Sequence, residues 1–187
     1  MKPALETTSV PGWSTAARRP DADLSGRSWT VVGFGPDAQP MVSAWQEQIL
    51  GADPAAAIMV HLVDEADGDR AAAQAVDTDL ADALVGWRLM IGGPADACLR
   101  LRAHALRRGV GDDEIVVGST AVATRDVLCA HCQARTRAEV GLEEVLPCAG
   151  CGRNLFVYYH VSRLKGAHLG FMVDAEQMQA AEPVAAP

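Results

Sequence analysis

Four cysteines in two closely spaced pairs constrain this chain more than any other feature. The pairs read Cys129-Ala-His-Cys132 and Cys148-Ala-Gly-Cys151, and fifteen residues separate them. A two-residue spacer lets both sulfurs of one turn face a single ion, and a hairpin brings the second pair opposite the first. Gly150 and Gly152 suit a turn that points backbone amides at sulfur and takes a positive φ. The spacing predicts a metal site with these four cysteines as ligands.

Zinc is the ion expected at this site, and iron is the alternative, because soft thiolates bind both. Four thiolates leave no open coordination position, so the pattern favours a structural site over a catalytic one. Iron would instead make the site an electron carrier. His131 lies inside the first pair and is interpreted as a solvated or supporting residue, since four sulfurs already complete the site. Disulfides are the other use of paired cysteines. The sequence after Met1 shows no apolar core typical of a secretory signal, so we expect a cytoplasmic protein.

The charge balance bears on possible partners. Half of the 187 residues are hydrophobic, which is enough for a core, and no apolar run reaches the ~18 residues of a membrane span. Residues 1–124 hold 10 basic and 17 acidic residues, and residues 125–187 hold 6 and 7. Nucleic-acid binding relies on a basic face, so a zinc-ribbon nucleic-acid module is not favoured. It stays an alternative if the basic residues near the cysteines cluster. These are Arg135, Arg137, Arg153, Arg163 and Lys165.

The first two-thirds of the chain predict an α/β domain behind a short leader. Residues 1–27 are rich in Pro, Ser, Thr, Arg and Asp without periodicity, and are predicted to be a flexible leader. Apolar, strand-like runs and segments of helical spacing then alternate to about residue 124. The expected strands are 29–35, 57–63, 87–92 and 115–118, and the expected helices lie around 41–49, 76–84 and 94–108. Such alternation predicts a small three-layer domain with a parallel sheet over residues 28–124.

Glycines follow two of the expected strands, where nucleotides bind in parallel sheets. Gly33-Phe-Gly35 resembles the Gly-rich pyridine-nucleotide loop of the ferredoxin reductase family. The segment from Leu89 through Gly92-Gly93-Pro94 to Ile115 resembles that family's strand, turn, helix and Gly-Val connection. The resemblance implies an NAD(P)H site at Gly33, Gly35, Gly92, Gly93 and Pro94. Two departures weigh against it. Gly92 replaces the family's usual cysteine, and Asp37 places a carboxylate where a phosphate would approach. NAD(P)H is therefore possible but not favoured.

The end of the chain combines the cysteine pairs with a segment rich in aromatic residues, histidines and glycines. Residues 125–160 are predicted to form a metal ribbon, whose folding depends on the ion because it buries little apolar surface. The stretch 158–176 mixes aromatic residues, histidines and glycines without a clear period. One interpretation is a strand and loop packed on the ribbon. The other is a docking tail, 161–176, buried by a partner subunit. The docking candidates are Tyr158, Tyr159, His160, His168, Phe171 and Met172. Residues 177–187 are expected to be disordered.

The cysteine array and this segment together resemble a known family. The array is followed by Tyr-Tyr-His-Val-Ser-Arg and by Gly-Ala-His-Leu-Gly-Phe-Met-Val-Asp-Ala-Glu. Over residues 125–176 this is similar to the small accessory subunit of bacterial dimethylamine monooxygenase. The resemblance implies a multicomponent enzyme. In that family a haem-containing oxidase subunit uses O2 to convert dimethylamine to methylamine and formaldehyde. A reductase subunit with FMN and a [2Fe-2S] cluster brings electrons from NAD(P)H.

The remaining residues favour an accessory role within such a complex. No nucleophile–base pair stands in a recognisable motif, and no haem or flavin signature is present, so no catalytic residue is assigned. Cys98 lies on the apolar side of an expected helix and is interpreted as a core residue. We expect a non-catalytic subunit whose ribbon and tail dock the oxidase while the α/β domain presents an acidic face to another subunit. A rubredoxin-like iron subunit that carries electrons in the same complex is the alternative.

Overall fold

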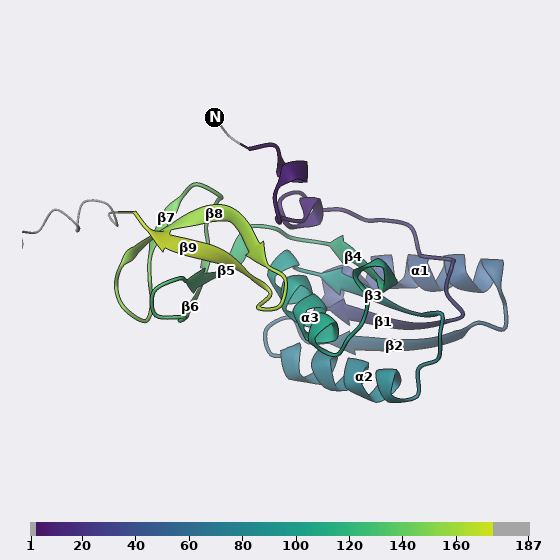
Figure 1. The fold of residues 1–187 in the computed structure, drawn as a ribbon. Helices are drawn as coiled ribbons and strands as arrows, with labels where there is room; N and C mark the ends of the chain where they lie inside the picture. The colour runs from purple at the N-terminus through teal and green to yellow at the C-terminus, as the bar shows by residue number, and fades with distance from the viewer. Residues whose placement is uncertain (1–2, 174–187) are drawn as a thin grey trace, which may run out of the picture.

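The computed structural model describes residues 3–173, which form an α/β domain and a ribbon domain side by side (Figure 1). The elements of the first domain are β1 (Ser28–Phe34), α1 (Gln39–Ala52), β2 (Ala57–Val63), α2 (Asp69–Ala81), β3 (Trp87–Gly93), α3 (Ala95–Arg107) and β4 (Ile115–Ser119). Each expected strand and helix of this domain is present. None of the helices within residues 3–173 combines the length and the apolar character that crossing a membrane requires.

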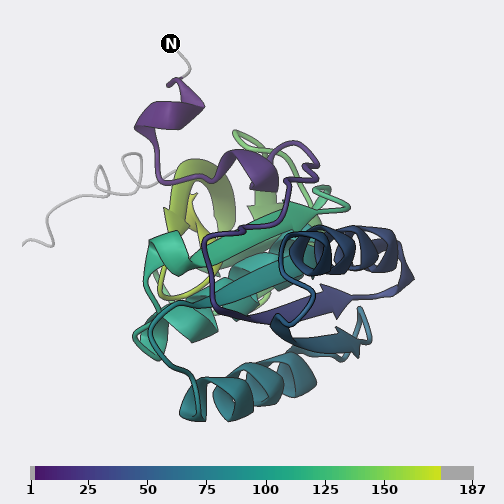
Figure 2. The ribbon, with the colours of Figure 1, turned by 90° about the vertical axis from the view of Figure 1, so that its right-hand side faces the viewer.

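The first domain is a three-layer unit, as expected. Its four parallel strands run in the order β2-β1-β3-β4. Helix α1 packs on one face through Met41, Trp45 and Ile49, and α2 and α3 cover the other face through residues such as Val76 and Leu101. Figure 2 shows α1 and α2 on opposite sides of the sheet. The chain reverses its winding between β1 and β3, so the glycine stretches lie together at the topological switch point.

The second domain is an antiparallel-rich sheet that carries the cysteines. Its strands are β5 (Thr124–Cys129), β6 (Arg135–Glu139), β7 (Val145–Pro147), β8 (Asn154–Ser162) and β9 (Ala167–Met172). They run in the order β6-β5-β9-β8-β7. Cys129 is the last residue of β5 and Cys132 lies in the turn to β6, and the second pair lies in the turn between β7 and β8. The α/β class with a parallel sheet and a cysteine cluster is therefore confirmed.

The segment predicted as a docking tail is part of this sheet. Residue 161 lies inside β8, and β9 is the central strand, paired with β5 on one side and with β8 on the other. The interpretation as a strand packed on the ribbon is therefore confirmed for residues 161–173, and the ribbon extends beyond residue 160. A central strand cannot swing out as an arm without breaking both ladders. The last residues of the expected tail, 174–176, and the expected disordered end, 177–187, lie outside the described residues.

The leader makes contacts that the expectation of a flexible segment did not include. It contains two short 3-10 turns, Leu5–Thr7 and Gly12–Ser14. Val10 is buried against Leu99 of α3 and Val161 of β8, at the junction of the two domains. Further along, the indole N–H of Trp45 donates to the Pro20 carbonyl at 2.8 Å. The sequence has no periodicity here because each of these contacts is made by a single residue.

Candidate metal centre and its surroundings

The four predicted ligands meet at one point between the two turns. Their sulfur atoms all lie within 4.8 Å of one another. The Cys129 and Cys151 sulfurs are 3.9 Å apart, and those of Cys132 and Cys148 are 3.6 Å apart. An ion ~2.3 Å from each of four tetrahedral sulfurs would separate them by ~3.8 Å. The donor set and its spacing therefore fit zinc, and they fit iron equally, because both ions accept four thiolates.

The backbone of both turns is shaped for this convergence. Gly152 has φ 71°, and Gln133, which follows the first pair in the same way, has φ 62°. The two turns thus have matching geometry, although only one uses glycine. Gly150 has no positive φ, so that part of the expectation was wrong. Glycine fits position 150 for a steric reason instead, because a Cβ there would lie 2.5 Å from the Ala134 side chain. Its amide N–H points at the Cys148 sulfur, 3.4 Å away.

Local hydrogen bonds favour the thiolate form that a metal needs at two of the four cysteines, Cys148 and Cys151, whereas the neighbouring cysteines raise the pKa of Cys132. Backbone N–H groups of Cys151 and Gly150 lower the pKa of the Cys148 thiol to about 6. His131 is exposed and does not lie among the sulfurs, as expected. Its Nδ1 is 3.0 Å from Arg153, so this contact joins the first turn to the second. His131 therefore supports the arrangement of the turns and is not needed as a ligand.

The cysteines also form part of the ribbon core. Cys129 and Cys148 are buried with Leu146, Leu155 and Val157, whereas Cys132 is exposed. The ion would thus lie between a small apolar core and the molecular surface. The ribbon's core depends on the cysteine cluster because two of its members are ligands.

The predicted nucleotide residues come together, but side chains of the protein occupy the space around them. A Cβ on Gly35 would lie 2.9 Å from the Glu65 carboxylate, and a Cβ on Gly92 would lie 2.9 Å from Met41. Gly33 is likewise enclosed by Leu62. A pyrophosphate at this loop would meet the Glu65 carboxylate, as well as the Asp37 expected from the sequence. Gly93 and Pro94 precede α3, and Pro94, the predicted first residue of this helix, is its N-cap, so the helix begins one residue later, at Ala95.

Other predicted roles have clear positions. Cys98 is fully buried, its thiol lies 3.5 Å from the Gly93 carbonyl, and burial raises its pKa, which agrees with a core residue. Three of the five basic residues named for the ribbon pair with carboxylates, among them Arg135 with Asp126 at 3.7 Å. Arg137 pairs with Asp96 at 2.8 Å and Arg163 pairs with Asp112 at 2.8 Å. The condition for nucleic-acid binding, a cluster of unpaired cations, is therefore poorly met.

The docking candidates divide between the two faces of the ribbon sheet. His168 is fully buried, and Tyr159 packs at the domain junction, so neither belongs to an open docking surface. Met172 pairs across with Leu155 and lies on the inner face. Tyr158 and Phe171 are the candidates on the open face. They are 53% and 44% exposed, and His160 lies beside them. Alternation along β8 and β9 explains this split, because neighbouring residues point to opposite faces.

The remaining candidates form an aromatic patch. We define it as Phe156, Tyr158, His160, Leu169 and Phe171. The ring centroids of Tyr158 and Phe171 are 5.7 Å apart, and those of Phe156 and Tyr158 are 6.1 Å apart, with the rings edge to face in both pairs. Four members of the patch, all except Phe156, line a hollow of about 450 Å³.

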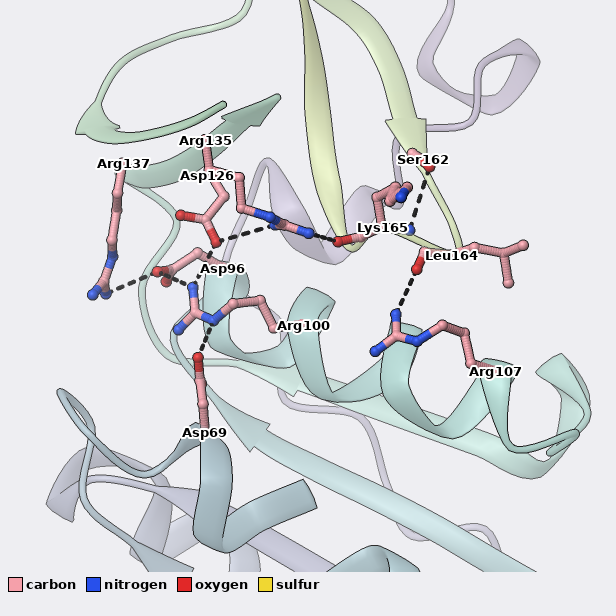
Figure 3. A network of polar contacts seen from close by, with 10 residues as sticks. All are labelled: Asp69, Asp96, Arg100, Arg107, Asp126, Arg135, Arg137, Ser162, Leu164 and Lys165. Atoms are coloured by element: carbon pink, nitrogen blue, oxygen red, sulfur yellow. Dashed lines mark hydrogen bonds and ion pairs between the residues drawn. The ribbon is translucent and has the colours of Figure 1, made fainter. Parts of the chain in front are cut away.

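Sequence reasoning missed the polar network that joins the two domains (Figure 3). Arg100 of α3 contacts Asp96 on its own helix at 2.9 Å, Asp126 of β5 at 2.9 Å, and Asp69 of α2 at 2.6 Å. Asp96 and Asp126 are buried, and burial alone would lower the pKa of Arg100. The three carboxylates outweigh this and raise it. Arg137 reaches Asp96 from β6, as given above. No motif in the sequence marks this network, because its members come from four separate elements.

A second junction contact lies at the β8–β9 turn. The Arg107 guanidinium of α3 donates to the Leu164 carbonyl at 2.5 Å across the junction, and within the ribbon the Arg135 guanidinium donates to the Lys165 carbonyl of the same turn (Figure 3). Gly166 in this turn has φ 60°, and a Cβ there would lie 2.5 Å from the Leu99 carbonyl of α3. The ribbon thus packs on α3 through the close backbone contact at Gly166 and through the arginine network.

Comparison with known proteins supports the resemblance of the ribbon. Residues 126–171 match the family model for the C-terminal domain of dimethylamine monooxygenase subunit DmmA-like proteins. This segment begins in β5, ends in β9, and contains all four cysteines. The resemblance stated for residues 125–176 is confirmed by this match. The likeness to the ferredoxin reductase domain agrees with the layout of the first sheet and otherwise stays a prediction.

A curated relative extends the similarity. The chain is 39% identical over 104 residues to the heme-dependent oxidative N-demethylase delta subunit of Ectopseudomonas mendocina (strain ymp). The alignment covers 54% of this chain and 57% of that protein, so the chain spans a little over half the length of the relative. No solved structure matches the chain.

Proposed function

We propose that this protein is an accessory subunit of a multicomponent, NAD(P)H- and O2-dependent oxidative N-demethylase in the cytoplasm, with dimethylamine as the substrate of the complex. The observation that carries the proposal is the four-sulfur cluster in a ribbon that matches the subunit's family model. The name of the curated relative supports a haem-dependent complex. In this proposal the haem lies in an oxidase subunit, and a flavin and iron–sulfur reductase subunit supplies electrons.

A structural role of the metal centre supports an accessory function. When bound, the ion would hold the two turns together through four thiolates and have no position left for a substrate. Cys129 and Cys148 connect it to the ribbon core, so the ion would fix the shape of β8 and β9. These strands carry the aromatic patch. The proposed role of the site is therefore to present this patch rigidly to the oxidase subunit.

The aromatic patch has the chemistry of a docking surface. Large aromatic side chains with exposed polar atoms are frequent energetic centres of protein interfaces. Tyr158 and Phe171 should each contribute on the order of 2 kcal/mol when buried by a partner, which is about 30-fold in Kd. Replacing both with Ala should therefore release the oxidase subunit. Leu164→Ala is the matched control, because Leu164 is 56% exposed on the β8–β9 turn and outside the patch.

The decisive experiment purifies the tagged full chain from its native cells and identifies what accompanies it. We expect a haem-containing oxidase subunit and a flavin and iron–sulfur reductase subunit in stoichiometric amounts. The complex should release formaldehyde from dimethylamine with NAD(P)H and O2, and omission of this chain on reconstitution should lower the rate. Full activity and assembly without the chain would refute the proposal.

An electron-carrying iron site is the second candidate. Cys132 is exposed, so one ligand lies at the surface, where electrons can pass to a partner. Metal analysis with a visible spectrum separates the two roles. Stoichiometric zinc without colour supports the structural role. Iron with thiolate charge-transfer bands that bleach on reduction supports electron transfer.

A further inference from the structure

Strand β2 forms an open edge of the parallel sheet. It is the last strand in the order β2-β1-β3-β4, and no strand within residues 3–173 pairs with its outer side. All seven of its residues are at least partly exposed, whereas six of the seven residues of β1 are buried. Met59 and Leu62 are each 54% exposed. The edge therefore combines free backbone groups with apolar side chains.

The opposite edge of the same sheet is covered by the chain itself. Arg18 of the leader and Ser119 of β4 exchange two backbone hydrogen bonds, of 3.2 and 2.8 Å. The Ser119 hydroxyl also donates to the Trp13 carbonyl at 2.6 Å. The leader thus acts as an additional short strand beside β4. Within residues 3–173 the chain thus covers one edge of this sheet and leaves the other bare.

Strand β2 also lacks the features that usually keep an edge free of other strands. It contains no proline, lysine or other permanently charged residue. Its pairing with β1 runs without a bulge from Ala57 to Val63. Bare edges of this kind accept added strands, and proteins avoid them unless a partner covers them.

A pocket beside β2 indicates what such a strand would carry. The pocket lies between α2 and the start of the sheet and has a volume of about 310 Å³. Met59 and Trp87 form apolar walls, and the carboxylates of Asp79 and Asp82 lie in its lining. The Asp79 side chain is 7% exposed, accepts a hydrogen bond from the Thr30 hydroxyl at 2.8 Å, and lies 2.8 Å from the His61 ring of β2. No lysine or arginine of residues 3–173 lines this pocket, so its apolar walls and the Asp82 carboxylate beside the Asp79–His61 pair fit the stem and the charged head of a basic side chain.

The charges at the two ends of β2 agree with a basic partner. Asp53 precedes the strand, and Asp64, Glu65 and Asp67 follow it. None of these four forms an ion pair with another residue of the described chain. A second copy paired antiparallel would bring Asp64 and Glu65 of one chain towards Asp53 of the other, and like charges would repel. The edge is therefore better suited to a strand of another protein with basic residues.

We propose that β2 accepts an extended strand from a partner protein, and that a lysine or arginine of this strand enters the pocket over Asp79 and Asp82. The added strand would bury Met59 and Leu62. This docking mode is separate from the aromatic patch, which lies on the ribbon. It rests on the proposed function only for the choice of complex in the second experiment below.

The first test uses the isolated, metal-loaded full chain and a synthetic probe. The probe is a peptide of alternating valine and threonine with one central arginine, and the control peptide has glutamate in place of arginine. We expect the arginine peptide to shift the amide NMR signals of β2 and of the pocket, and to bind at least ten times more tightly than the glutamate peptide. Absence of shifts at β2, or equal binding of the two peptides, would overturn the inference.

Variants of β2 and of the pocket test which residues contribute to binding of the arginine peptide. Leu62→Lys should weaken the arginine peptide at least tenfold, and Asp82→Asn should weaken it several-fold and flatten its dependence on salt. Leu50→Lys is the matched control, because Leu50 is 42% exposed on α1 and should leave binding unchanged. Equal effects of Leu62→Lys and Leu50→Lys would count against β2 as the site. Concentration-dependent dimerisation that protects β2 in the free chain would assign the edge to a second copy and overturn the proposal.

The second test follows hydrogen exchange of residues 57–63 in the free chain and in the purified complex. The inference expects at least tenfold slower exchange in the complex. If the complex forms and β2 exchanges as before, this inference fails while the proposed function stands. If the peptide binds β2 but no oxidase or reductase subunit accompanies the chain, the proposed function fails while the inference stands.

Discussion

The α/β domain buries apolar side chains on both faces of its sheet, whereas the ribbon has one small core that two metal-ligand cysteines complete. On α1 alone, Met41, Val42, Trp45 and Ile49 are buried against one sheet face. The ribbon core consists of short side chains around the sulfur cluster. Burial on both faces makes the first domain independent of any ion, and the ribbon needs one because its apolar surface is too small. The two domains should therefore respond differently to the same perturbation.

Removal of the metal should produce the largest difference. Cys148→Ser, or a strong chelator, should unfold the ribbon and leave the parallel sheet of the α/β domain folded, because apparent zinc-binding energies of such sites are about 10–16 kcal/mol. Hydrogen exchange should rise throughout β5–β9 and stay slow in β1 and β3. Cys98→Ala is the control, since Cys98 is buried in the α/β domain and should leave the metal stoichiometry unchanged. A ribbon that keeps slow exchange after chelation would show that it does not depend on the ion.

The next effect concerns the junction between the domains. Arg100→Met should cost about 3 kcal/mol, because it removes the guanidinium shared by the buried carboxylates of Asp96 and Asp126, although Arg137 still pairs with Asp96. Thermal unfolding should then separate into two transitions. Arg108→Met is the matched control. Arg108 is 53% exposed in its pair with Asp77, and such surface pairs contribute less than about 1 kcal/mol. Similar losses in both variants would mean that Arg100 does not couple the domains.

A pH effect should arise from His168 in the ribbon. Burial and the nearby Arg125 charge lower the pKa of His168 to about 4, from 6.5, and neither ring nitrogen has a hydrogen-bond partner among residues 3–173. The unfolded chain therefore binds a proton between pH 6.5 and pH 4 that the folded chain does not. Stability should fall by about 3 kcal/mol as the pH decreases through this window and should not depend on His168 above it.

Chemical denaturation of the wild type and of His168→Leu at several pH values would test this. The leucine variant should lack the additional loss below pH 6.5, because it cannot be protonated. It should also retain its stability near pH 7, since the ring makes no hydrogen bond that leucine would remove. Parallel pH profiles of the two proteins would assign the loss of stability to other groups.

These differences also explain what could be predicted from the sequence. Residues 57–63 and 87–93 are mostly apolar runs, each with one basic residue, between helical segments, so local patterning identifies β2 and β3. The cysteine spacing identifies the metal site because the ligands come in local pairs. Strand β9 has no such signal. It contains His168 and Gly170, whose burial depends on β5 and β8, which are distant in sequence.

Long-range polar contacts were the least predictable part. Asp69, Asp96, Arg100 and Asp126 each have the sequence context of an ordinary surface residue, and only the packing of α3 against β5 brings them together. The contacts of the leader could not be predicted for a related reason, since Val10 is buried by residues from two different domains. Contacts of this kind depend on tertiary structure, and no local periodicity of the sequence indicates them.

The smallest predicted effect compares the two cysteine turns. Gly152 and Gln133 occupy equivalent positions with positive φ, a conformation that is unfavourable for residues with a side chain. A Cβ on Gly152 would meet no atom within 4 Å, so Gly152→Ala changes only the backbone preference and should cost about 1 kcal/mol. Gln133→Gly should stabilise the ribbon by up to about 1 kcal/mol. Chelator competition at fixed pH would measure both as opposite shifts in metal affinity. If both shifts have the same sign, the two turns do not hold the ion in the equivalent way that their matching φ angles indicate.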